Sequence, residues 1–176
     1  MKVKLDINRN IIPSLHQLNW HALQYALYCA VQTENMMRRG KRNIKVTSYP
    51  ACAACFQSDI CGNIGYGYTG QYKLIPNSFR TPLRRMLQSL GSIGSTGILS
   101  KNLIGKCAEV SAVNSFLYEC EKCCRNSMLF YPYGCGRNYI ESRSVSKNFM
   151  MSEAFRPRTL EHIDRCANCV QLFGSN

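Results

Sequence analysis

The sequence predicts an α/β domain in which helices alternate with strands. Residues 14–39 place apolar side chains at nearly helical intervals, and residues 106–124 do so with a wider apolar face. Three further segments have the composition of strands: 43–50, 65–75 and 138–146. Helices that alternate with strands are typical of layered α/β domains.

The segments between these elements predict shorter structures. Residues 51–61 (ACAACFQSDIC) indicate a cysteine-bearing turn, and residues 80–90 indicate a short basic helix. The Gly- and Ser-rich run 91–97 is expected to form a flexible loop that borders a site. Residues 159–173 are expected to end as a helix that Gly174 closes.

Length and composition favour a single domain. With 176 residues and 45% hydrophobic content, residues 1–176 can bury one substantial core. We divide the domain into a helix and strand region with basic residues, 1–90, and a second part, 91–176. No apolar run of about 18 residues is present, and the N-terminus lacks the regions of a secretory signal peptide. We therefore expect no membrane span and a cytoplasmic protein.

The charge balance indicates a polyanionic partner. The chain has 22 Lys and Arg against 10 Asp and Glu, a net charge of +12. Such an excess attracts phosphate backbones with a strongly salt-dependent affinity, so nucleic acid is the expected partner. The alternative is that the charge only keeps the protein soluble.

Two short motifs predict a zinc site. Eleven cysteines in a reducing compartment more often bind metal than form disulfides. The run CAE contains Cys107 and Glu109, and the run CANC contains Cys166 and Cys169. A hydrolytic zinc site needs three protein ligands and a fourth position for water, which these three thiolates can provide.

The positions of these residues on helices favour their roles. Cys107 is expected in the first turn of the central helix, where unpaired N–H groups and the helix dipole favour a thiolate, and Cys166 is expected to begin the last helix. Glu109 on a buried helix must be paired or functional, and its natural role is proton transfer from water to the substrate and the leaving amine. The alternative is a structural zinc site with a fourth cysteine, in which Glu109 is a solvated helix residue.

These motifs carry a family resemblance. CAE at 107–109 and CANC at 166–169 resemble the two zinc motifs of the cytidine deaminase superfamily, most closely those of the YwqJ-like bacterial toxin deaminases. Arg165 stands where that superfamily has proline. The resemblance implies a mixed sheet flanked by helices in α/β/α layers, and zinc-dependent conversion of cytosine to uracil. It also implies that the backbone at Ala108 and the side chain of Asn102 contact the substrate.

The same resemblance implies a biological setting. A toxin domain would be delivered into a target cell without a signal peptide, and an acidic immunity protein would cover its basic cleft. Single-stranded DNA is the first expected substrate, ahead of RNA and duplex DNA. The alternatives are a free nucleoside or nucleotide deaminase, and a zinc-stabilised nucleic-acid-binding module without catalysis.

Basic and aromatic residues are candidates for the substrate side. Arg156 and Arg158 precede the second zinc motif and are expected to contact phosphates near the target base. Tyrosines between 131 and 139 can flank the site, whereas His162 is expected to be structural. The basic clusters are Arg38, Arg39, Lys41 and Arg42; Arg80, Arg84 and Arg85; and Arg137, Arg143, Lys147, Arg156, Arg158 and Arg165.

Two further cysteine pairs suggest a second, structural zinc. Cys52 and Cys55 form CAAC, and Cys120 and Cys123 form CEKC, the composition of a four-thiolate site. Thirteen residues of helix separate Cys107 from Cys120, about 20 Å, so the pairs cannot share the first metal. Cys61 and Cys135 are alternative ligands. The competing interpretation is a set of free or disulfide-paired thiols.

Overall fold

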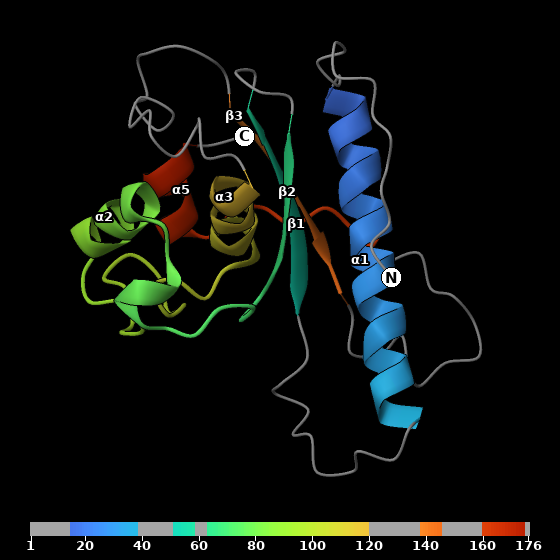
Figure 1. Cartoon of the computed structure of the whole chain (residues 1–176), viewed down its shortest axis with the longest axis horizontal. Coiled ribbons are helices and arrows are strands. Elements are labelled where there is room, and N and C mark those ends of the chain that lie inside the picture. The colour runs from blue at the N-terminus through green and yellow to red at the C-terminus, as the bar shows by residue number, and fades with distance from the viewer. Residues whose placement is uncertain (1–14, 39–50, 59–62, 120–137, 146–159, 175–176) are drawn as a thin grey trace.

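The protein is an α/β domain of three layers, as the sequence predicts. The computed structural model describes residues 15–38, 51–58, 63–119, 138–145 and 160–174. A three-stranded sheet lies between helix α1 on one face and helices α2, α3 and α5 on the other (Figure 1). The elements are α1 Leu15–Arg38, β1 Cys52–Ser58, β2 Ile64–Tyr68, a 3-10 turn Pro76–Ser78, α2 Thr81–Ser89, α3 Ala108–Glu119, β3 Asn138–Ser144 and α5 Ala167–Phe173. No helix in these ranges is both long and apolar enough to cross a membrane.

The sheet has the order β2-β1-β3, and both pairings of its strands are antiparallel. Cys55 on the central strand lies opposite Tyr66 on one side and Glu141 on the other. The extended segment 161–163 pairs with the outer edge of β3, because the Ser144 N–H donates to Glu161 O at 2.9 Å and the Ile163 N–H donates to Ser142 O at 3.0 Å. The expected mixed sheet is therefore not seen among the described strands.

The central strand occupies a segment for which the sequence predicts a turn. Residues 51–61 were expected to form a cysteine-bearing turn, but Cys52–Ser58 is β1 and is buried from Ala53 to Ser58. Ala is depleted in strands, and a strand covered on both faces shows a continuous apolar run instead of an alternating pattern. The expected strand 43–50 lies outside the described residues, and the one expected over 65–75 ends at Tyr68.

The central helix packs directly on β2 because two glycines remove the side chains between them. A Cβ atom added at Gly67 would lie 2.1 Å from Ala112 N, and one at Gly65 would lie 2.2 Å from Ala112 O. Residues Ala108 to Asn114 of α3 are all buried, followed by Phe116 and Leu117. The sequence-based interpretation of this segment as the central buried helix is confirmed for the described residues.

We expect Gly67→Ala to destabilise the domain strongly. The added methyl group cannot fit without separating β2 from α3, so the free energy of unfolding should fall by about 3 kcal/mol. Denaturant unfolding measures this loss. Gly70→Ala is the matched control, because its Cβ meets nothing within 4 Å and only its positive φ of 79° is strained. Equal losses in the two variants would contradict the close packing.

Helix α1 is attached to the other face of the sheet by apolar contacts and a buried polar network. Ala53 packs with the α1 residues Ala26, Cys29 and Ala30. Beside them Glu141 forms ion pairs with Arg143 at 3.2 Å and with His162 at 2.9 Å, and Arg143 also donates to Asn19 Oδ1 on α1. Arg143, a basic candidate from the sequence, therefore helps to attach α1, whereas His162 pairs with Glu141 on the sheet.

Candidate metal centre

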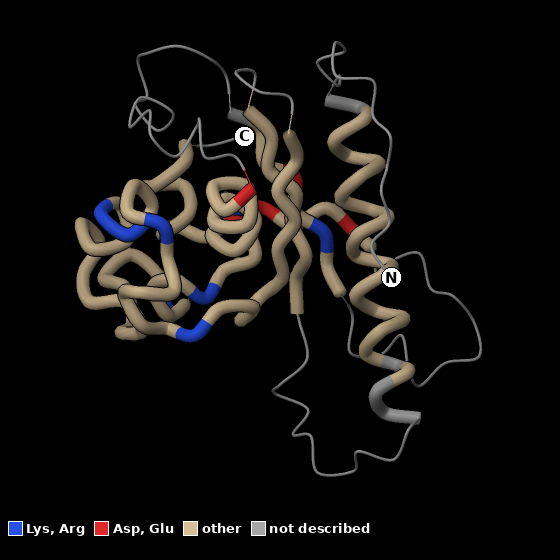
Figure 2. Tube along the Cα trace, viewed as in Figure 1, with Lys and Arg blue, Asp and Glu red and all other residues tan. Residues whose placement is uncertain are grey.

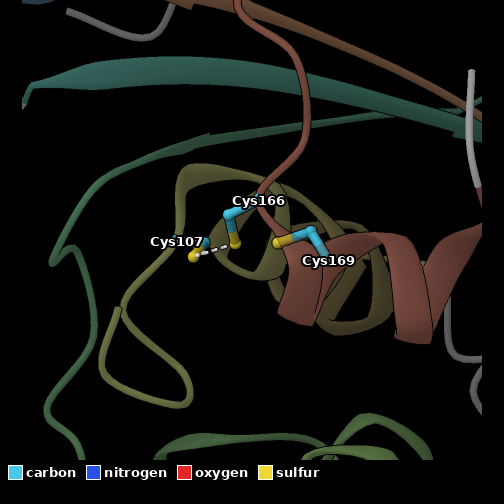
Figure 3. A group of neighbouring side chains, drawn as sticks. All are labelled: Cys107, Cys166 and Cys169. Carbon is cyan, nitrogen blue, oxygen red and sulfur yellow. Dashed lines mark hydrogen bonds between the residues drawn. The ribbon is translucent and has the colours of Figure 1, made fainter. Parts of the chain in front are cut away.

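Three cysteines from two distant segments converge on the face of the sheet that carries α3. The sulfur atoms of Cys107, Cys166 and Cys169 all lie within 4.8 Å of one another, and those of Cys107 and Cys166 are 3.5 Å apart. Figure 3 shows the three side chains pointing toward a common point. The structure therefore brings together the three ligands that the sequence predicts.

Two of these cysteines are helix N-caps. The Cys107 carbonyl accepts the Ser111 N–H at 3.1 Å, and the Cys166 carbonyl accepts the Val170 N–H at 2.9 Å. Cys107 thus lies one residue before α3, not within its first turn as expected, while Cys166 begins α5 as expected. Both cysteines therefore lie at the positive end of a helix dipole, a position that favours thiolates.

The spacing of the sulfurs fits a tetrahedral zinc ion. Zinc binds thiolate sulfur at about 2.3 Å, so two sulfurs on one tetrahedral ion are about 3.8 Å apart. The observed separation of 3.5 Å and the upper limit of 4.8 Å bracket that value. Within the described ranges, no fourth cysteine, histidine or carboxylate belongs to this group. The arrangement therefore matches a three-ligand site that leaves one position for water.

The protonation of the three thiols is coupled. Hydrogen bonds from Cys107 and Cys169 lower the pKa of Cys166 well below its ordinary value, and Asn102 adds to this effect. The pKa of Cys107 is raised because it donates to Cys166, and that of Cys169 is raised by its hydrogen bonds to both other thiols. The three thiols are therefore linked by hydrogen bonds, and Cys166 is the one whose pKa is lowered.

Glu109 lies buried beside these thiols. It is 5% exposed, and burial is the main reason why its pKa is raised above the ordinary value. Its own backbone N–H lowers the pKa, as do the side chains of Ser142 and Cys169. The Ser142 hydroxyl is itself buried and lacks a hydrogen bond of good geometry among the described residues. A buried carboxyl with an elevated pKa is suited to holding and releasing a proton.

Asn102 and Ala108 also lie at the centre. The Asn102 carbonyl accepts a hydrogen bond from the Asn168 Nδ2 amide at 3.2 Å, and the Asn102 side chain contacts the sulfur of Cys166. Asn168, which is buried, separates the two cysteines of the second motif. Asn102 thus contacts one of the three candidate ligands, a role that the sequence did not predict, and such contacts tune ligand geometry. Ala108 is buried in the first turn of α3.

Arg165 has a structural role that sequence reasoning missed. Its Nη1 donates to Gly174 O at 2.7 Å and its Nη2 to Ile140 O at 3.2 Å. The guanidinium thereby satisfies a backbone carbonyl at the end of α5 and ties that helix to β3. The place of Arg165 in the basic cluster had suggested a cation that is free to bind phosphate. Its guanidinium is instead bound to groups of the fold. The only signal was its position in place of proline before the second motif.

We expect Arg165→Met to loosen the second pair of ligands. Loss of charge-assisted hydrogen bonds should lower the free energy of unfolding by about 2 kcal/mol and weaken zinc binding. Competition with a chromogenic chelator measures the zinc affinity. Arg85→Met on the exposed side of α2 removes the same charge without these contacts and should leave zinc affinity unchanged. Equal zinc affinity in the two variants would contradict the role of Arg165.

One of the two cysteine pairs predicted to bind a second zinc ion does not fit that role. Cys52 packs with the cluster that contains α3, whereas Cys55 packs with Leu18 and Ala22 of α1. Residues three apart on a strand point to opposite faces, so Cys52 and Cys55 cannot bind the same ion.

Several residues with predicted roles lie outside the described residues: Cys120 and Cys123, the alternatives Cys61 and Cys135, and the phosphate candidates Arg156 and Arg158. So do the tyrosines at 131 and 133, while Tyr139 packs on the α1 side.

Comparisons of the chain with known proteins identified no relative. No protein-family model matches the chain, and no match was found among the curated proteins or the solved structures. The candidate metal centre and its surroundings are therefore the basis for assigning a function.

Proposed function

We propose that this chain is a zinc-dependent hydrolase that deaminates cytosine to uracil in nucleic acid. The most direct support is the convergence of three thiols, within 4.8 Å of one another, beside the buried carboxyl of Glu109. The metal-ligand motifs lie at the starts of two helices, which is also what the resemblance to the cytidine deaminase superfamily implies. Single-stranded DNA is the first substrate to test.

The residues of the site divide the chemistry between them. Cys107, Cys166 and Cys169 would hold the zinc ion, which would supply Lewis acidity and lower the pKa of a water molecule toward neutrality. Glu109 would accept a proton from the attacking water, transfer it to the ring nitrogen of the base, and later deliver a proton to the departing amine. The water oxygen replaces the amino group, so the products are uracil and ammonia. Asn102 keeps Cys166 oriented throughout.

The charge of the region around the centre supports a polymeric substrate. Residues 63–119 contain six Lys and Arg against two Glu, and one of the two is the buried Glu109. Figure 2 shows Lys and Arg on α2 and on the loops beside it. Lys101 and Lys106 are exposed in the loop that leads into Cys107. An excess of cations favours phosphate contacts, and an acidic inhibitor protein would fit the same surface.

The experiment is a substrate survey with zinc-loaded protein. Cytosine-containing single-stranded DNA, duplex DNA, RNA and free cytidine are each incubated with the protein, and conversion is measured by sequencing and by ammonia release. We expect C-to-U conversion on at least one polymer, loss after chelation and recovery on adding zinc. Conversion of cytidine alone would favour a nucleoside deaminase. DNA binding with no conversion of any substrate would show a zinc-stabilised binding module instead.

A further inference from the structure

Two aliphatic side chains project from the loop that precedes the first metal ligand. Ile98 is 95% exposed and Leu99 is 55% exposed, and Ile98 is the most exposed large apolar residue among those the structure describes. Both lie between Thr96 and Leu103, which form an antiparallel bridge. Single exposed apolar residues are common on protein surfaces, but this pair lies at the tip of a folded hairpin beside the metal centre.

The hairpin has a well-defined internal structure. The Ile104 N–H donates to Ser95 O at 2.9 Å, and the Gly94 N–H donates to Ile104 O at 2.9 Å. At the tip, the Asn102 N–H donates to Ser100 Oγ at 3.1 Å. These hydrogen bonds hold the base and the tip of the loop. The Gly- and Ser-rich segment was expected to be flexible, but it is part of an ordered hairpin.

The hairpin is also fixed to the metal centre. The Asn168 amide, between two cysteine ligands, donates to Asn102 O at 3.2 Å. A Cβ atom at Gly97 would lie 2.6 Å from that same amide group, so the backbone of the loop packs against it with no space between. The Asn102 side chain also contacts the sulfur of Cys166. The tip is therefore held in a set position relative to the metal ligands.

We infer that Ile98 and Leu99 form an apolar wedge that enters the base stack of DNA next to the target cytosine. This inference rests on the proposed function and deepens it, because it assigns how a stacked base reaches the site. Enzymes that act on a base must extrude it, and aliphatic side chains that enter between base steps replace the lost stacking. Lys101 is exposed within the same hairpin and Lys106 just beyond it, where each can contact a flanking phosphate.

The test combines a stacking probe with turnover. The fluorescent base 2-aminopurine is placed beside the target cytosine in a duplex and in a single strand, and zinc-loaded protein is titrated in. We compare the unaltered chain, the double variant Ile98→Ser with Leu99→Ser, and Val170→Ser, which alters an exposed apolar residue on α5 outside the hairpin. Because the altered side chains are exposed, the melting temperature and zinc content of all three should agree.

We expect the unaltered chain and Val170→Ser to raise the fluorescence of the probe on binding. The double variant should still bind DNA but raise the fluorescence little, and its turnover on duplex should fall on the order of tenfold, with a smaller fall on single strands. Equal fluorescence and turnover in the double variant would overturn the inference, as would an equal loss in Val170→Ser. If the rise in fluorescence depends on Ile98 and Leu99 but no cytosine is converted, the wedge is retained and deamination is rejected. Failure of the unaltered chain to bind DNA would reject both.

Discussion

Glu109→Gln is expected to reduce deamination about a thousandfold, within the range that general acid–base residues contribute. The amide keeps the size of the side chain but cannot accept a proton from water or return one to the amine. Zinc content should be unchanged, because Glu109 is not one of the three converging ligands. The fold should persist as well, since a neutral amide is less costly to bury than a carboxylate. Turnover on the substrate identified in the survey, together with the zinc-to-protein ratio, measures both expectations.

The matched control is Glu119→Gln at the other end of the same helix. Glu119 is exposed and lies about 15 Å along the axis from Glu109, ten residues at about 1.5 Å each. It should retain full activity. Activity in Glu109→Gln close to that of Glu119→Gln would reject proton transfer by Glu109. An inactive Glu109→Gln that has also lost zinc would show that the carboxyl supports the metal instead.

Cys169→Ser is expected to abolish zinc binding at neutral pH and to destabilise the whole domain. Its sulfur is fully buried between α3 and α5, and a serine hydroxyl is a poor ligand for zinc. At a thousandfold excess of zinc over its dissociation constant, loss of binding removes about 4 kcal/mol of stability. That corresponds to a fall in melting temperature of about 10 °C for a domain of this size. Calorimetry with and without zinc measures the difference.

Cys29→Ser is the control for the substitution itself. Cys29 is also a buried thiol, but it lies on α1 across the sheet from the metal centre. The free energy of unfolding of Cys29→Ser should fall only by the cost of burying a hydroxyl group. Adding zinc should still stabilise this variant. A zinc-dependent rise in melting temperature that survives in Cys169→Ser would contradict the proposed centre. A second zinc ion that remains bound would instead point to ligands outside the described residues.

Local patterns predicted the parts of the structure whose causes are local. The period of α1 and the turn at Gly174 follow from a few neighbouring residues, and both are confirmed. The ligand pair of the second motif and the proximity of Glu109 to Cys107 also follow from short spacings. By contrast, the CAAC segment suggested a metal-binding turn because its spacing resembles a zinc motif. As the buried strand β1, the same spacing sends Cys52 and Cys55 to opposite faces.

Sequence alone was sufficient for the α/β class, the net positive charge and the identity of the three converging thiols, because each depends on composition or on short spacing. Only the tertiary structure showed that Arg143 and Arg165 are bound to groups of the fold, since a count of charges cannot distinguish a free cation from a paired one. Only it placed Asn102 against Cys166 and the Ile98 hairpin beside the metal centre. The contacts of Asn102 with α5 join residues that are 64 or more positions apart. They form because α3 and α5 pack on one face of the sheet.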